Sequence, residues 1–226
     1  MSKHLQRDID RLNNELLTIS SVVEEMIDKA TLALSERKYD LADQVVGSDS
    51  FVDQREVHVE EECLKMLALH QPVAVDLRRI ATVMKVNNDL ERIADLAVSI
   101  AQRAKAMDEC PAFPQLEVLP RMVVLATQMV RGAMDAFVNM DAVSARRIMA
   151  MDSSVDQYNR DIIADLQIIM QKRPELVAAA LHCFSAVRHI ERIADHATNI
   201  AEDVVYLVEG DIVRHRHNQP DAAASG

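Results

Sequence analysis

A charged segment occurs twice in this chain at a spacing of about 100 residues, and this repetition constrains the fold more than any other feature. The segment LERIADLAVSIA begins at Leu90 and IERIADHATNIA begins at Ile190, and the two agree at eight of twelve positions. A second pair, DSFVDQ from Asp49 and DSSVDQ from Asp152, lies 103 positions apart. These matches indicate an internal duplication of about 100 residues, which is a usual domain size.

Composition and periodicity favour helices in both repeats. The 226 residues include only four Gly and six Pro, and 49% are hydrophobic. Helical periodicity predicts helices over 5–36, 40–70 and 72 or 76 to 107, and then over 115–140, 141–172 and 174–209. Prolines or capping aspartates mark the breaks. We therefore expect an all-α fold of two tandem antiparallel three-helix bundles, with repeats over 1–110 and 111–212 and a flexible tail over 213–226.

Charge and cysteine content limit the classes of partner and compartment. A net charge of −11, with no basic stripe, argues against nucleic acid as a partner. Three cysteines without CxxC spacing are expected to be reduced thiols packed as small hydrophobic residues. The first twenty residues are too charged for a signal peptide, and no apolar stretch reaches the roughly 18 residues of a membrane span. A cytoplasmic location is expected.

The repeated carboxylates are predicted to lie off the apolar stripe of their helices, on the exposed side. If each pair of neighbouring helices folds back at Pro72 or Pro174, carboxylates on the two helices become level with one another. The four facing pairs are Asp53 with Glu91, Asp49 with Asp95, Asp156 with Glu191, and Asp152 with Asp195. Carboxylates that face one another repel unless positive charge neutralises them.

Two sources of that positive charge are considered. Arginines from the same segments would leave an ordinary solvated surface, as expected for isolated pairs such as Glu24 and Asp28. The candidate arginines are Arg55, Arg92, Arg160 and Arg192. Alternatively, the carboxylates bind metal, and a purely oxygen ligand set favours magnesium, calcium, manganese or iron over zinc.

Three histidines recur every seven residues in the last predicted helix, at His182, His189 and His196. The equivalent positions of the first repeat are Thr82, Asp89 and Leu96. We therefore expect surface histidines or histidines with satisfied hydrogen bonds, rather than ligands. His215 and His217 are expected to lie in a solvated tail.

The chain carries no catalytic motif. It lacks a Gly-rich phosphate loop, HExxH and a visible Ser-His-Asp arrangement, and no Glu-x-x-His pair of the di-iron type occurs. A protein that is not an enzyme is expected. A metal-dependent or metal-storage bundle remains an alternative.

The complete set of motifs resembles the PhoU family of bacterial phosphate transport accessory proteins. The resemblance rests on QPVAVDLRRI after the first turn, DLERIAD in one half, IERIADHATNIAE in the other and the closing YLVEGDIVRH. It covers the chain from about Leu5 to His215. Ala94 and Ala194 stand where the family often has glycine, a change that should leave packing intact.

The resemblance implies a cytoplasmic, non-enzymatic regulator that acts between the phosphate ABC transporter and a phosphate-sensing histidine kinase. It also implies a homodimer, membrane association only through partners, and binding of metals such as iron through E/DxxxD motifs. Carried over residue by residue, the ligands are the eight carboxylates of the four facing pairs. Leu96 and Ser99 replace His196 and Asn199, so the first site is expected to hold metal more weakly or to hold a different metal. An accessory protein of another phosphate carrier is the alternative.

Overall fold

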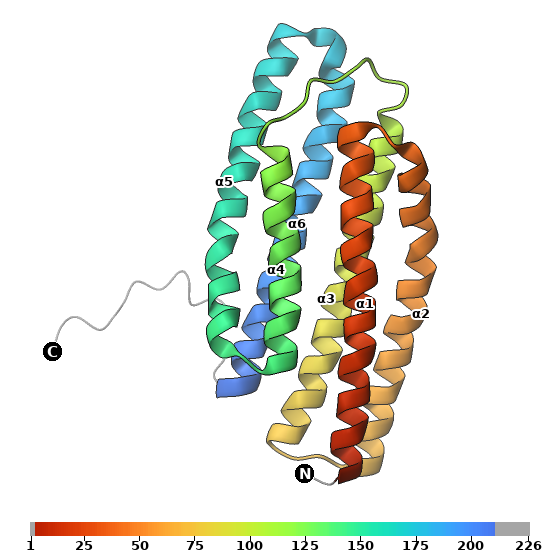
Figure 1. The fold of residues 1–226 in the computed structure, drawn as a ribbon, viewed down its shortest axis with the longest axis vertical. Coiled ribbons are helices and arrows are strands. Elements are labelled where there is room, and N and C mark those ends of the chain that lie inside the picture. Colours follow the sequence, from red (N-terminus) through yellow and green to blue (C-terminus); the bar gives the residue numbers. More distant parts are fainter. Residues whose placement is uncertain (1–2, 211–226) are drawn as a thin grey trace, which may run out of the picture.

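Six long helices form the described part of the chain, residues 3–210, in the computed structural model (Figure 1). The first repeat gives α1 (Lys3–Glu36), α2 (Tyr39–His70) and α3 (Val75–Ala106). The second gives α4 (Leu119–Asn139), α5 (Ala142–Lys172) and α6 (Val177–Glu209), with a short 3-10 turn, Pro174–Leu176, before α6. The all-α prediction is confirmed, and residues 3–210 contain no strand. The predicted tail and its two histidines lie outside the described residues.

Helix boundaries differ from the prediction where proline chemistry decides them. α4 begins at Leu119 rather than at 115, because Pro120 lacks an N–H and fits only in the first helical turn. Asp141 caps α5 as expected, since its side chain accepts hydrogen bonds from the backbone N–H groups of Val143 and Ser144. The same role was expected of Asp40, but α2 already begins at Tyr39 and its N-cap residue makes no side-chain cap.

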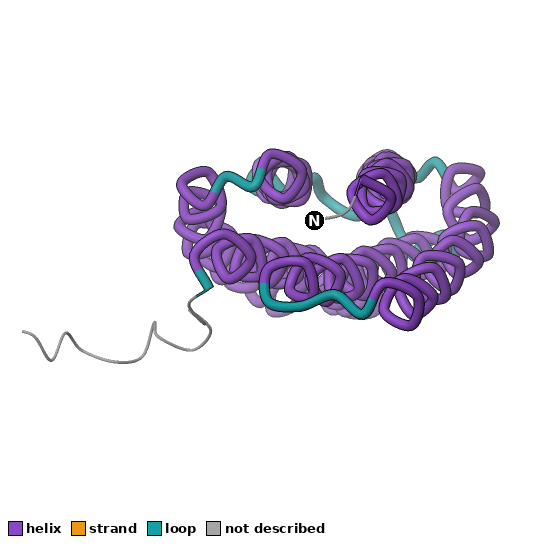
Figure 2. The backbone as a smooth tube through the Cα atoms, turned by 90° about the horizontal axis from the view of Figure 1, so that it is seen from below, coloured by secondary structure: helices purple, strands orange, loops and turns teal. Residues whose placement is uncertain are grey.

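The helices form two layers (Figure 2). α1 and α4 lie side by side over α3 and α6, while α2 and α5 occupy the outer edges (Figure 1). Consecutive helices run antiparallel, because the connections between helices within each repeat are short. As a result the α2–α3 turn and the α5–α6 turn lie at opposite ends of the molecule (Figure 1).

The two repeats share one hydrophobic core. Buried side chains of all six helices form a single connected cluster, to which α3 and α6 contribute the central residues. Ile93 and Ile193, the isoleucines of the two ERIAD segments, are both fully buried. α3 and α6 also pack against each other. The bundles are therefore halves of one folding unit rather than two separate cores.

The cysteines are free thiols, as expected, with Cys63 and Cys183 buried and Cys110 half-buried. Within residues 3–210, none of the helices combines the length and apolar character needed to cross a lipid bilayer.

Candidate metal-binding site

The antiparallel register derived from the sequence holds in both hairpins. In the first, the side-chain amide of Asn87 donates to the backbone carbonyl of Glu56 at 2.9 Å, which fixes α3 against α2 one turn from Glu91. In the second, the hydroxyl of Thr198 donates to Asp152 Oδ1 at 3.3 Å. Each hairpin thus brings its ERIAD segment to the level of the aspartates on the preceding helix.

The ionised carboxylates of the first hairpin repel one another, which favours their protonated forms. Burial raises the pKa of Asp49 above its ordinary value, and repulsion by Asp53 and Asp95 raises it further. The pKa of Glu91 is raised by burial and by Asp95, with smaller contributions from Glu56 and Asp53, while Arg92 opposes the rise. Repulsion between these pairs therefore connects all four predicted residues of this half.

The second hairpin repeats this arrangement more strongly. Burial raises the pKa of Asp195 to about 6, and repulsion by Glu191, Asp152 and Asp156 adds to it. Burial also raises the pKa of Glu191, with Arg188 opposing and Asp156 and Asp152 reinforcing the rise. The predicted group of four carboxylates is again together, and repulsion among its members outweighs the opposing effect of His196 on Asp195.

The two glutamates are less exposed than predicted. The side chains of Glu91 and Glu191 are only 21% and 14% exposed, whereas that of Asp95 is 48% exposed. The helical periodicity of the sequence predicted that all of these residues lie off the apolar face of their helices, and this is correct. The periodicity of one helix does not reveal which helix packs beside it, however. α2 packs beside Glu91, and α5 packs beside Glu191.

Burial leaves carboxylate oxygens without hydrogen bonds at matching positions of the two repeats. Within the described chain, Oε2 of Glu91 and Oε2 of Glu191 are buried and accept no hydrogen bond, and the same is true of Asp49 Oδ1. An unsatisfied buried acceptor is destabilising by roughly 1–3 kcal/mol, and more when it is charged. These orphaned oxygens are the feature that a bound cation would satisfy.

The predicted arginines neutralise this group only in part. Arg92 forms an ion pair with Glu91 Oε2 at 3.4 Å that lacks hydrogen-bond geometry, and it lies 3.3 Å from Asp95. Arg55 pairs instead with Glu15 at 2.8 Å, and Arg160 donates to Gln157 at 2.9 Å. In the second half Arg188, which the sequence reasoning did not select, binds Glu191 Oε1 at 2.9 Å.

The donor set suits a hard cation, but the side chains are not yet arranged around one. Carboxylate oxygens are the ligands that magnesium, calcium, manganese and iron accept. Within residues 3–210, no three Asp, Glu, His or Cys side chains lie close enough together to hold one ion as they stand. Side-chain rotation would be needed to bring the carboxylates of a hairpin onto one ion.

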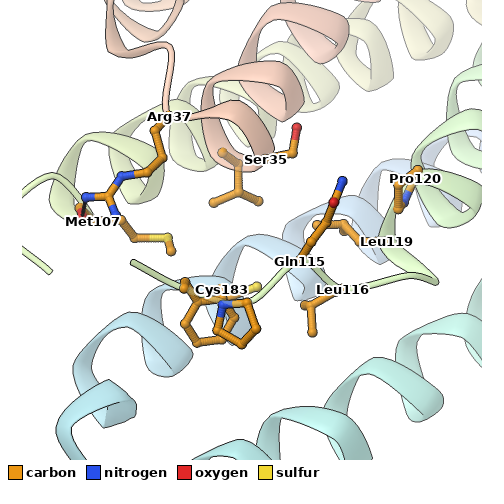
Figure 3. Close-up of a pocket in the computed structure, with 11 residues that line it drawn as sticks. Ser35, Arg37, Met107, Gln115, Leu116, Leu119, Pro120 and Cys183 are labelled. Atoms are coloured by element: carbon orange, nitrogen blue, oxygen red, sulfur yellow. Dashed lines mark hydrogen bonds between the residues drawn. The ribbon is translucent and has the colours of Figure 1, made fainter. Parts of the chain in front are cut away.

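A separate cavity of about 200 Å³ lies between the end of α1, the linker and α6 (Figure 3). It contains no ready nucleophile, because burial raises the pKa of the Cys183 thiol to about 12. The guanidinium of Arg37 donates hydrogen bonds to the backbone carbonyls of Met107 and Cys110 at 3.0 and 3.1 Å, just beyond the C-terminal end of α3. None of the eight predicted carboxylates lines this cavity.

Comparison with known protein families shows to which family this chain belongs. The sequence model of the PhoU domain matches the chain twice, over residues 16–104 and 119–204. The chain belongs to the PhoU family.

Several PhoU relatives align over almost the entire chain. The phosphate-specific transport system accessory protein PhoU homolog of Aquifex aeolicus is 35% identical over 94% of this chain and 96% of its own length. PhoU of Escherichia coli is 32% identical over 95% of this chain and 91% of its own length. The crystal structure of PhoU from Pseudomonas aeruginosa superposes with a TM-score of 0.86 at 34% identity, covering 91% of this chain and 99% of that one. The relatives from Aquifex aeolicus and Escherichia coli are named as accessory proteins rather than as enzymes.

Sequence reasoning missed two residues that border the carboxylates of this PhoU chain. Glu56 lies one turn beyond Asp53, and its pKa is raised by burial and by Glu60 and Asp53. Thr198, one turn beyond Asp195, donates to Asp152. Both follow a predicted residue at a spacing of three, so extending the search by one helical turn would have found them.

Asp195 gives this PhoU chain a pH dependence that can be measured without metal. Because the folded-state pKa of about 6 exceeds the ordinary 3.8, the folded state binds this proton more tightly than the unfolded state does. The resulting stabilisation is present below about pH 4 and is lost as the pH rises through about 6. Replacing Asp195 by Asn should remove this pH-dependent loss of stability. The loss is worth about 1 kcal/mol, because the side chain is only partly buried and solvent screens its charge. Urea unfolding between pH 4 and 7 measures it, and identical profiles for both proteins would contradict it.

Proposed function

We propose that this protein is a non-enzymatic regulator of phosphate uptake that restrains the phosphate-starvation response when phosphate is plentiful. The observation that carries the proposal is the match to phosphate-specific transport system accessory proteins over nearly the whole chain. In this proposal the protein links the phosphate ABC transporter to a sensor histidine kinase. A starvation-promoter reporter in a strain that lacks the protein tests this role.

The architecture suits an adaptor. The chain exposes two related hairpins whose turns lie at opposite ends of one six-helix body with a shared core (Figure 1). Two similar surfaces on one body can engage two partners, or two copies of the protein, at the same time. We propose a cytoplasmic location, recruitment to the membrane by the transporter, and a homodimer.

Metal binding is part of the proposal. Asp49, Asp53, Glu91 and Asp95 would hold metal in the first hairpin, and Asp152, Asp156, Glu191 and Asp195 would do so in the second. The support is the matching pair of orphaned glutamate oxygens together with the raised pKa values of the carboxylates. A bound cation would supply positive charge, and the carboxylates from both helices would then fix the hairpin surface that a partner meets.

Replacing Glu191 and Asp195 together by Ala should remove metal from the second hairpin while leaving helicity nearly unchanged. Both residues lie outside the apolar stripe, and their removal relieves repulsion. The measurement is the metal content of protein purified without chelator or affinity tag, alongside far-ultraviolet circular dichroism.

The matched control is the double replacement of Asp161 and Asp165 by Ala. This pair has the same spacing on the exposed face of α5. This double replacement should have the same metal content as the wild-type protein. Equal metal content in all three proteins would support the solvated-surface interpretation instead.

A further inference from the structure

Two rows of side chains at seven-residue spacing meet where α3 packs against α6. The α3 row consists of Thr82, Asp89, Leu96 and Arg103. The α6 row consists of His182, His189, His196 and Asp203. We call these two rows the seam. Residues seven apart fall on one face of a helix, so each row runs along the contact between the repeats.

The half of the seam nearest the α6 C-terminus is balanced in charge. His196 Nδ1 lies 2.8 Å from Asp89 Oδ1, which joins the two repeats. Lys85, beside the α3 row, lies 3.0 Å from Asp203 Oδ1, and Asp203 is only 2% exposed. Each buried acid here has a basic partner.

The other half of the seam contains basic groups and no acid in either row. The helices are antiparallel, so one heptad beyond the Asp89–His196 pair Leu96 is level with His189. Arg103 lies further along α3, still close enough to act electrostatically on His189. The duplication explains the imbalance. At its spacing of 100 residues, Asp89 corresponds to His189 and Asp203 corresponds to Arg103, so each acid of the balanced half is replaced by a basic side chain.

Two nitrogen atoms in this half are buried without a hydrogen-bond partner among residues 3–210. They are Nε of Arg103 and Nδ1 of His189. The hydroxyl of Ser185 lies 3.4 Å from His189 Nε2, and when it donates there the ring proton resides on Nδ1, the orphaned atom. Arg192 and Arg103 both lie close enough to His189 to act on its ring electrostatically, so positive charge is concentrated around the ring.

We infer that this acid-free half of the seam binds a small tetrahedral oxyanion such as inorganic phosphate, between Arg103 and His189. The guanidinium of Arg103 presents a fork of N–H donors that matches two oxygens of such an anion. His189 Nδ1–H donates to a third oxygen. The anion takes the place that a carboxylate holds in the balanced half, and it would tie α3 to α6 across the boundary between the repeats.

The inference goes beyond the regulatory role and does not depend on it. Isothermal titration of the purified full chain with inorganic phosphate, at constant ionic strength set with chloride, provides the test. Saturable binding is expected. The imidazole NMR signals of His189 should shift with the same saturation, whereas those of His196, already paired with Asp89, should not. No saturation, or an equal response to chloride, would overturn the inference.

Replacing Arg103 by Gln should weaken phosphate binding at least tenfold, because a charged two-point contact is lost. Arg121→Gln is the matched control, since Arg121 is an exposed arginine on α4 outside the seam and its loss changes the net charge equally. Unchanged affinity in Arg103→Gln, or equal losses in both variants, would refute the site.

Replacing Arg103 by Met separates a binding role from a purely structural one. Without phosphate this variant should be at least as stable as the wild type, because a buried unsatisfied donor has been removed. Phosphate should raise the melting temperature of the wild type and leave that of the variant unchanged. A variant that responds to phosphate as strongly as the wild type would contradict the inference.

Discussion

Cells that lack this protein are expected to express their phosphate-starvation genes in phosphate-rich medium at the level of starved wild-type cells. In the proposed role the protein controls phosphate uptake through contacts with the transporter and the kinase. If the protein is the proposed adaptor, its removal would disconnect the kinase from the transporter whatever the phosphate supply. A starvation-promoter reporter assayed at high phosphate measures the effect.

Complementation sharpens this experiment. The wild-type protein should restore repression, and so should the Asp161→Ala, Asp165→Ala control. The Glu191→Ala, Asp195→Ala variant should restore it less well if the metal supports partner binding. Normal repression at high phosphate in the deletion strain would count against the regulatory role.

Replacing Ile193 by Ala should lower the free energy of unfolding of the whole molecule by about 2–5 kcal/mol. Ile193 is fully buried in the shared core, so its truncation removes apolar contacts and leaves a cavity. Because α6 packs against α3, the loss should reach the first repeat as well. Urea unfolding measures the total, and amide hydrogen exchange of α2 and α5 measures its distribution.

The control is Leu181→Ala on the same helix, where the leucine is 55% exposed. It should change the free energy of unfolding by no more than about 0.5 kcal/mol. If Ile193→Ala lowered protection in α4 to α6 alone, while α2 kept its wild-type protection, the repeats would be separate folding units and the shared core would not govern stability.

Much of the fold could be predicted because apolar periodicity, helix-ending residues and short turns are all visible in the local sequence. The 3.6-residue period of apolar side chains defines each helix, and the prolines and Asp141 mark several of the boundaries. The turns at 71–74 and 173–176 are short and require antiparallel neighbours, so the turn position alone sets which residues are level. That is why Asp49 and Asp95 were correctly placed together, and likewise Asp152 and Asp195.

Burial of the site residues could not be predicted in the same way. A helical wheel describes one helix in isolation, so it placed Glu91 and Glu191 correctly off the stripe but could not show the neighbouring helix that covers them. The same limit explains the arginines. Arg55 and Arg160 were near the acids in sequence, yet their side chains turn to Glu15 and Gln157.

The sequence by itself determined the duplication, the all-α class, the register within each hairpin and the identity of the grouped carboxylates, because all of these follow from periodicity and short-range connection. Only the tertiary structure decided how the two repeats meet. The contact between α3 and α6 joins residues more than 100 positions apart, such as Asp89 and His196, and no local pattern specifies which faces of two distant helices pack together. That packing merges the halves into one core and creates the seam, since burial and electrostatic balance depend on all the neighbours of a side chain at once.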